Sequence, residues 1–214
     1  MAALNNQARL TSIPMETLTA LFGSEAKVRA LRLFLFNPDT PFFLEEIAAR
    51  TRCTPAAVKR ELSFLLKSDL LKKRLITKEI DGAKERGMAY QLNAKFIYLE
   101  HLKNLLTVSS VSADETLMRR FSGVGRLKLF VASGIFIQDW EARIDLLIVG
   151  DELDLHKIEA AMKALEAEIG KELAYSAFET PDFEYLLGIH DRLIRDILDY
   201  PHVTLLDRLG VEPS

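Results

Sequence analysis

Apolar side chains recur three and four residues apart through the first third of the chain, which is the period of a helix. In the first such stretch Val28, Leu31 and Leu35 share one face. Capping residues mark where helices begin: Ser24 precedes this stretch, and the pair Thr54-Pro55 precedes the third. The pattern predicts three helices, at residues 24–37, 44–50 and 55–67.

The period changes to two after residue 70, and this alternation predicts strands. Residues 71–80 form the first predicted strand, which has a polar face, and residues 88–92 form the returning strand. The loop between them, 81–87, contains two glycines. Three helices followed by a two-stranded hairpin, within about residues 18–93, is the order of a winged helix-turn-helix domain.

An amphipathic helix is predicted at residues 94–107, and a stretch of small polar residues up to 113 follows it as a linker. The apolar stripe of this helix has two interpretations: it pairs two copies of the chain, or it packs on the chain's own first domain. The stripe consists of Phe96, Leu99, Leu102 and Leu106.

Strands then alternate with helices, which indicates an α/β domain. The predicted strands are 127–132, 144–149, 172–178 and 203–206. The predicted helices are 114–121, 154–169, 181–187 and 189–199. We therefore expect a two-domain α+β/α/β protein. Its parts are a winged helix-turn-helix domain at 1–93, a linker helix and hinge at 94–113, and an α/β domain with a mixed sheet at 114–214.

Hydropathy, the N-terminal sequence and cysteine content bear on whether the protein is membrane-bound, secreted or cytoplasmic. The sequence has no apolar run of about 18 residues, so we expect no membrane span. The N-terminus lacks the basic-then-apolar order of a secretory signal. The single cysteine, Cys53, cannot form an internal disulfide, and we interpret it as a small apolar residue in the turn rather than a redox sensor. Together these features predict a cytoplasmic protein.

Charge divides unevenly along the chain, whose net charge is −3. Residues 1–107 hold 17 basic and 11 acidic side chains, and the remainder holds 11 basic and 20 acidic ones. A basic first half and an acidic second half indicate two modules with different partners.

The third predicted helix has the features of a DNA-recognition helix. Its apolar positions lie on one face, so the opposite face carries small residues near the start and cations after them. The hairpin adds further cations that can neutralise phosphates. The predicted DNA-binding residues are Thr54, Ala56, Lys59, Arg60, Ser63, Lys67, Lys73, Arg74, Lys78, Lys84 and Arg86. A solvated face, or a protein-binding module without DNA, is the alternative interpretation.

Two resemblances support this division. The run LFGSEAKVRALRLFLFNPDTPFFLEEIAARTRCTPAAVKRELSFLLKSDLLKK resembles the winged-helix domain of bacterial transcriptional regulators of the ArsR or MarR sort. The run KLFVASG…ARIDLLIVGD is similar to the nucleotidyltransferase-like domain that is fused to it in one bacterial group. The resemblance implies a DNA-binding regulator whose second domain derives from an enzyme.

The family's catalytic pattern is incomplete in this sequence. The resemblance implies a Gly-Ser turn that holds a triphosphate and two acids, one residue apart, that hold Mg²⁺. Here the turn is Ser133-Gly134, and Arg143 stands in the place of the first acid, with Asp145 remaining. We expect Arg143 to pair with Asp145 and its charge to repel a cation. The pair is then a phosphate clamp or a purely structural contact.

The predicted function follows from both halves. We expect a transcriptional regulator that binds double-stranded DNA as a homodimer, with no catalytic residue, metal or cofactor. Ser133, Gly134, Arg143 and Asp145 form a candidate pocket for a nucleotide or another anion. The alternatives are an active nucleotidyltransferase targeted by its winged helix, and a protein-binding adaptor.

Overall fold

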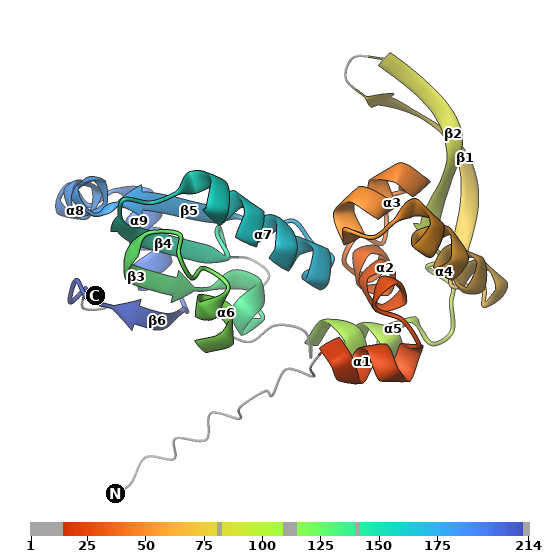
Figure 1. Ribbon diagram of the computed structural model, residues 1–214, viewed down its shortest axis with the longest axis horizontal. Coiled ribbons are helices and arrows are strands. Elements are labelled where there is room, and N and C mark those ends of the chain that lie inside the picture. The colour runs from red at the N-terminus through yellow and green to blue at the C-terminus, as the bar shows by residue number, and fades with distance from the viewer. Residues whose placement is uncertain (1–14, 81–82, 109–114, 140–141, 212–214) are drawn as a thin grey trace, which may run out of the picture.

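The computed structural model describes residues 15–80, 83–108, 115–139 and 142–211. Across these residues the fold is mixed helix and sheet, with a two-stranded and a four-stranded sheet. Figure 1 shows the first set of helices and its hairpin beside the larger sheet, with α7 reaching from one to the other. The prediction of a mixed α and β protein is confirmed at this level.

The N-terminal half begins with four helices around one apolar core. They are α1 (Met15–Phe22), α2 (Glu25–Phe36), α3 (Leu44–Thr51) and α4 (Pro55–Lys67). The predicted caps are confirmed, since Ser24 accepts a hydrogen bond from the N–H of Lys27 and Thr54 accepts one from Ala57. Helix α1 was not predicted; its Leu18 is fully buried against the other helices.

The hairpin consists of β1 (Leu71–Ile80) and β2 (Ala83–Leu92), paired antiparallel from Leu71–Leu92 to Ile80–Ala83. The second strand is therefore five residues longer at its start than the predicted 88–92, because residues that read as loop complete the ladder. In Figure 1 the hairpin extends well beyond the helices.

The segment after the hairpin is less regular than the predicted helix 94–107. It forms α5 (Leu99–Lys103) and a π-helical turn, η1 (Asn104–Val108). Leu106 is fully buried, and Phe96, Leu99 and Leu102 pack on the N-terminal core. Of the two interpretations of this stripe, packing within the chain is the one observed. Residues 109–114 of the predicted linker lie outside the described residues.

The C-terminal half is a four-stranded mixed sheet of order β5-β4-β3-β6, in which only β4 and β5 are parallel. Its strands are β3 (Arg126–Ala132), β4 (Leu146–Asp151), β5 (Tyr175–Glu179) and β6 (Val203–Asp207). Its helices are α6 (Glu115–Arg119), the 3₁₀ turn η2 (Gly134–Ile137), α7 (Leu155–Ile169), α8 (Thr180–Gly188) and α9 (Arg192–Asp199).

Helices cover both faces of this sheet. Phe130 and Ile148 face a core that includes α6 and α7, while their neighbours Val131 and Leu147 face a second core with α8 and α9. Burial on both sides explains why residues 129–132 of β3 and 146–149 of β4 are continuous apolar runs rather than alternating ones. Among the described residues no helix is long and apolar enough to span a membrane.

The two halves meet where the C-terminal end of α7 packs on α2. The side chain of Arg32, only 3% exposed, donates hydrogen bonds to the backbone oxygens of Leu106 and Glu168. The amide of Asn37 donates to the carbonyl of Gly170 at 2.9 Å. A Cβ on Gly170 would lie 2.5 Å from the backbone of Arg32, so only glycine permits this approach. The predicted hinge therefore connects halves that are packed together.

Candidate nucleic-acid interface and candidate ligand pocket

Helix α4 has one buried face and one exposed face. Val58, Leu62 and Leu65 are buried in the core. All the predicted DNA-binding residues of this helix and its cap are exposed; they are Thr54, Ala56, Lys59, Arg60, Ser63 and Lys67. The hydroxyl of Ser63 donates to the carbonyl of Lys59 at 2.9 Å. The exposed face therefore presents three cations behind a first turn of small residues.

Glu61 is a functional candidate that sequence reasoning missed. It is 3% exposed, its Oε2 lies 3.4 Å from Lys27 Nζ, and its Oε1 accepts a hydrogen bond from Arg60 Nε at 3.2 Å. Burial alone would raise the pKa of this carboxyl, but hydrogen bonds from Ser24, Arg60 and Lys27 hold the pKa below its usual value. Glu61 therefore stays ionised at neutral pH and pairs with both Lys27 and Arg60.

The hairpin has two faces, which carry different cations. The inner face carries Lys78 and contacts α3, and the outer face, on the opposite side, carries Lys73 and Leu75. Lys78 is half-buried and lies on the inner face, where its Nζ contacts both carboxylate oxygens of Glu46 at 2.9 and 3.0 Å. The same ammonium lies 5.5 Å from the ring centre of Phe43. These contacts engage Lys78 with α3, so of the predicted hairpin cations it is the one least available to a ligand.

On the outer face the strand register brings cations and apolar side chains together. Lys73 lies opposite Tyr90, its ammonium 5.8 Å from the ring centre, and the next outward pair is Leu75–Met88. Leu75 and Met88 are 56% and 50% exposed, a solvent-facing apolar pair that the charge count did not indicate. The other predicted hairpin cations, Arg74, Lys84 and Arg86, are exposed.

Among the predicted pocket residues, Asp145 has a structural role. One carboxylate oxygen accepts a hydrogen bond from the N–H of Ile135 and the other from the N–H of Ala174, both at 2.9 Å. The side chain is buried, and a Cβ on Gly134 would collide with it. Both oxygens are therefore engaged with backbone, and Gly134 is required because its φ of 57° lets the turn pass over the carboxylate.

The expected pair between Arg143 and Asp145 is wrong. Arg143 is exposed, and its Nη1 lies 2.9 Å from Oδ2 of Asp196 on α9. Strand β4 begins only at Leu146, so Arg143 is not one pleat from Asp145 on a strand, as the sequence had indicated. Asp196 lies far along the chain, and no local pattern identified it.

Ser133 and Arg143 line a cavity of about 340 Å³ that also contacts Arg192, Asp196 and Tyr200. The hydroxyl of Ser133 donates to the carbonyl of Ile144 at 2.6 Å, and Asp196 neutralises the nearest guanidinium. Of the four predicted pocket residues, Gly134 and Asp145 lie outside this lining. Within the described residues no three His, Cys, Asp or Glu side chains are grouped to hold a metal ion.

Comparison with known proteins adds no family. No family model matches the chain, and neither a curated protein nor a solved structure matches it. The geometry of α4, the hairpin and the second half therefore carries the functional argument.

Proposed function

We propose that the chain is a DNA-binding transcriptional regulator. Residues 1–93 act as a winged helix-turn-helix domain, and α4 enters the major groove of duplex DNA. The observation that supports the proposal is the exposed face of α4, where the predicted contact residues of this helix lie opposite its buried apolar positions. Small residues at the start of the helix allow close approach, and Lys59 and Arg60 reach phosphates or guanine edges.

The outer face of the hairpin supplies the second contact. Lys73, Lys84 and Arg86 are exposed along a ribbon that projects beyond the helices, as Figure 1 shows. Cations on such a ribbon neutralise phosphates beside the groove that α4 occupies. Leu75 and Met88, exposed between these cations, suit contact with sugars or base edges.

We propose that residues 114–214 form a nucleotidyltransferase-like domain without catalytic activity. Both oxygens of Asp145 accept backbone hydrogen bonds, and the position of the other acid holds Arg143, a cation that cannot coordinate Mg²⁺. The domain then acts as a sensor or assembly module in a cytoplasmic protein. Two-fold operators favour a homodimer, whose contact lies outside the buried stripe that contains Leu106.

Binding to duplex DNA over a series of salt concentrations tests the proposal. Fluorescence anisotropy with a short labelled random duplex should give an affinity that falls steeply with salt. The double variant Lys59→Ala/Arg60→Ala should weaken binding about tenfold or more and reduce the logarithmic salt slope by about two. Arg192→Ala/Arg195→Ala removes the same charge from the exposed side of α9 and should leave both values unchanged.

Three outcomes contradict the proposal. Absence of binding at low salt favours the protein-binding alternative. Equal losses in the two double variants would mean that net charge, not α4, governs binding. Transfer of label from a nucleoside triphosphate in the presence of Mg²⁺ would restore the enzyme alternative.

A further inference from the structure

A second cavity, of about 610 Å³, lies between the two halves of the chain. One wall is the end of α3 with the turn that leads into α4, and the other is the exposed side of α7. Its size and its place at a junction of two packed units are typical of small-molecule sites. It is separate from the cavity at Ser133 and Arg143 and shares no residue with it.

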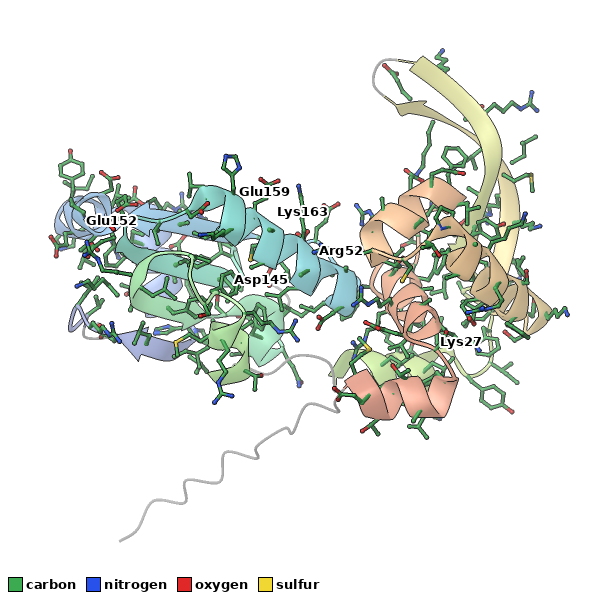
Figure 2. All side chains as sticks on the ribbon, viewed as in Figure 1. Lys27, Arg52, Asp145, Glu152, Glu159 and Lys163 are labelled. Carbon is green, nitrogen blue, oxygen red and sulfur yellow. The ribbon has the colours of Figure 1, made fainter. Side chains whose placement is uncertain are left out.

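The lining combines an apolar floor with charged side chains. Leu33, Ala49 and Ala160 supply apolar surface, and Gly170 also lines the cavity. Figure 2 shows Glu159 and Lys163 rising from the same side of α7, with Arg52 in the space between α7 and α3. An occupant of this cavity therefore contacts apolar carbon and charged groups together.

Most of the charges in the lining are already paired. Arg50 pairs with Glu172 across the junction. Lys163 lies 2.5 Å from Glu159; this hydrogen bond raises the pKa of Lys163 and lowers the pKa of Glu159. Glu166 accepts a hydrogen bond from the N–H of Leu173 at 2.9 Å. The acidic groups of the cavity therefore have partners, and a cationic ligand would have to displace one.

Arg52 is the exception. No ion pair or side-chain hydrogen bond engages its guanidinium anywhere in the described part of the chain. Its backbone is nevertheless fixed: Arg52 caps α3 with a left-handed φ of 52°, and its N–H donates to the carbonyls of Ala48 and Ala49. A fixed backbone, an unengaged guanidinium and an adjacent apolar floor match an anion attached to an apolar body.

We propose that this cavity binds a small amphiphilic anion, such as a carboxylate on a short hydrocarbon chain. The carboxylate pairs with Arg52, and the hydrocarbon lies on Leu33, Ala49 and Ala160. This ligand site is a proposal in addition to DNA binding, and it does not require that the chain binds DNA. Because Arg52 stands two residues before the cap of α4, Thr54, the ligand contacts both α7 and the segment that positions α4.

Direct binding to the whole chain tests the inference, with 8-anilinonaphthalene-1-sulfonate as the fluorescent probe. The probe should bind the native protein, and octanoate should displace it while octylammonium, of equal chain length, should not. Arg52→Gln should weaken probe binding about tenfold, because one charge-assisted contact is lost. Ala160→Trp, at an exposed position of α7, should fill the cavity and abolish binding.

Arg208→Gln, an exposed arginine outside the cavity, is the matched control and should bind as the native protein does. A thermal melt of each variant establishes that it is folded. The inference is overturned if the native protein does not bind the probe, if Arg52→Gln or Ala160→Trp binds unchanged, or if octylammonium competes as well as octanoate. Each of these results is independent of whether the chain binds DNA.

Discussion

Arg32 on α2 donates a hydrogen bond through Nη1 to the backbone carbonyl of Glu168, in the last turn of α7, at 2.9 Å. Its Nε donates to the carbonyl of Leu106 at 3.1 Å, so one buried side chain joins the helical core, the connecting segment and the sheet domain. Burial lowers the pKa of Arg32 to about 10, which leaves it charged at neutral pH. A cation at the C-terminal end of a helix is favourable.

Replacing this arginine should uncouple the two halves. Arg32→Met keeps much of the volume but leaves two buried carbonyls without donors, and we expect it to cost about 3 kcal/mol in the free energy of unfolding. Urea denaturation measures the loss, and calorimetry should show one transition become two. Arg208→Met, at an exposed site, is the control. A single transition of native midpoint in Arg32→Met would contradict the coupling.

Substitution of Gly170 by alanine should destabilise the fold more than the same substitution at Gly188. The φ of Gly170 is 87°, and a Cβ would lie 2.5 Å from the backbone of Arg32, so Gly170→Ala should cost about 2 kcal/mol or more. Gly188, at the end of α8, has no atom within 4 Å of the equivalent position. Gly188→Ala should therefore stay within about 0.5 kcal/mol of the native protein. Equal thermal shifts for the two variants would refute the close approach.

Glu61 should make stability depend on pH. Because the pKa of Glu61 is lowered in the folded state, its ionised form stabilises the fold above the usual carboxyl range, and this contribution is lost as pH falls through the folded-state value. Glu61→Gln should cost about 1–3 kcal/mol at pH 7, and the difference should vanish in acid. Unfolding midpoints measured along a pH series check this. A difference that is constant with pH would exclude the charge as its cause.

Asp145 should matter for stability rather than for chemistry. Asparagine cannot accept both of the hydrogen bonds that Ile135 and Ala174 donate, so Asp145→Asn should cost about 2 kcal/mol. Chemical denaturation is the measurement. A stable Asp145→Asn variant that loses a Mg²⁺-dependent nucleotide signal of the native protein would show that the carboxylate serves a metal instead.

Two lysines of the hairpin should behave differently. Lys73→Ala, on the outer face, should lower the logarithmic salt slope of DNA binding by about one with little change in stability. Lys78→Ala should leave the slope unchanged and cost about 1 kcal/mol, because it removes the partner of Glu46. Anisotropy and urea denaturation separate the two effects. If Lys78→Ala lowered the salt slope and Lys73→Ala did not, the inner face of the hairpin would be the one that contacts DNA.

Local signals explain what the sequence predicts well. Helices α2 and α4 begin at capping residues, Ser24 and Thr54, so their bounds follow from neighbours in sequence. Helix α4 has one buried face, whereas α2 is buried on most sides. The division of the hairpin cations also follows from alternation: in β1, Lys73 and Lys78 are five residues apart and must face opposite sides. The charge count alone did not separate Lys78, which contacts Glu46, from the cations on the opposite face.

Long-range contacts explain what could not be predicted. The partner of Arg143 is Asp196, on a helix that the sequence places after another strand, so spacing alone favoured the nearer Asp145. The carboxylate of Asp145 instead joins η2, at Ile135, to the segment before β5, at Ala174, and β4 begins after Asp145. Helix α1 gave too short an apolar pattern to be recognised, and tertiary burial of Leu18 stabilises it.

The docking of α7 on α2 has a mechanical consequence. Helix α2 also packs on α3 and α4, so it contacts both the helices of the N-terminal core and α7. Because the backbone at Gly170 lies against that of Arg32, we expect α7 and α2 to move together. A displacement of the sheet domain is then expected to reach α4 through its packing on α2.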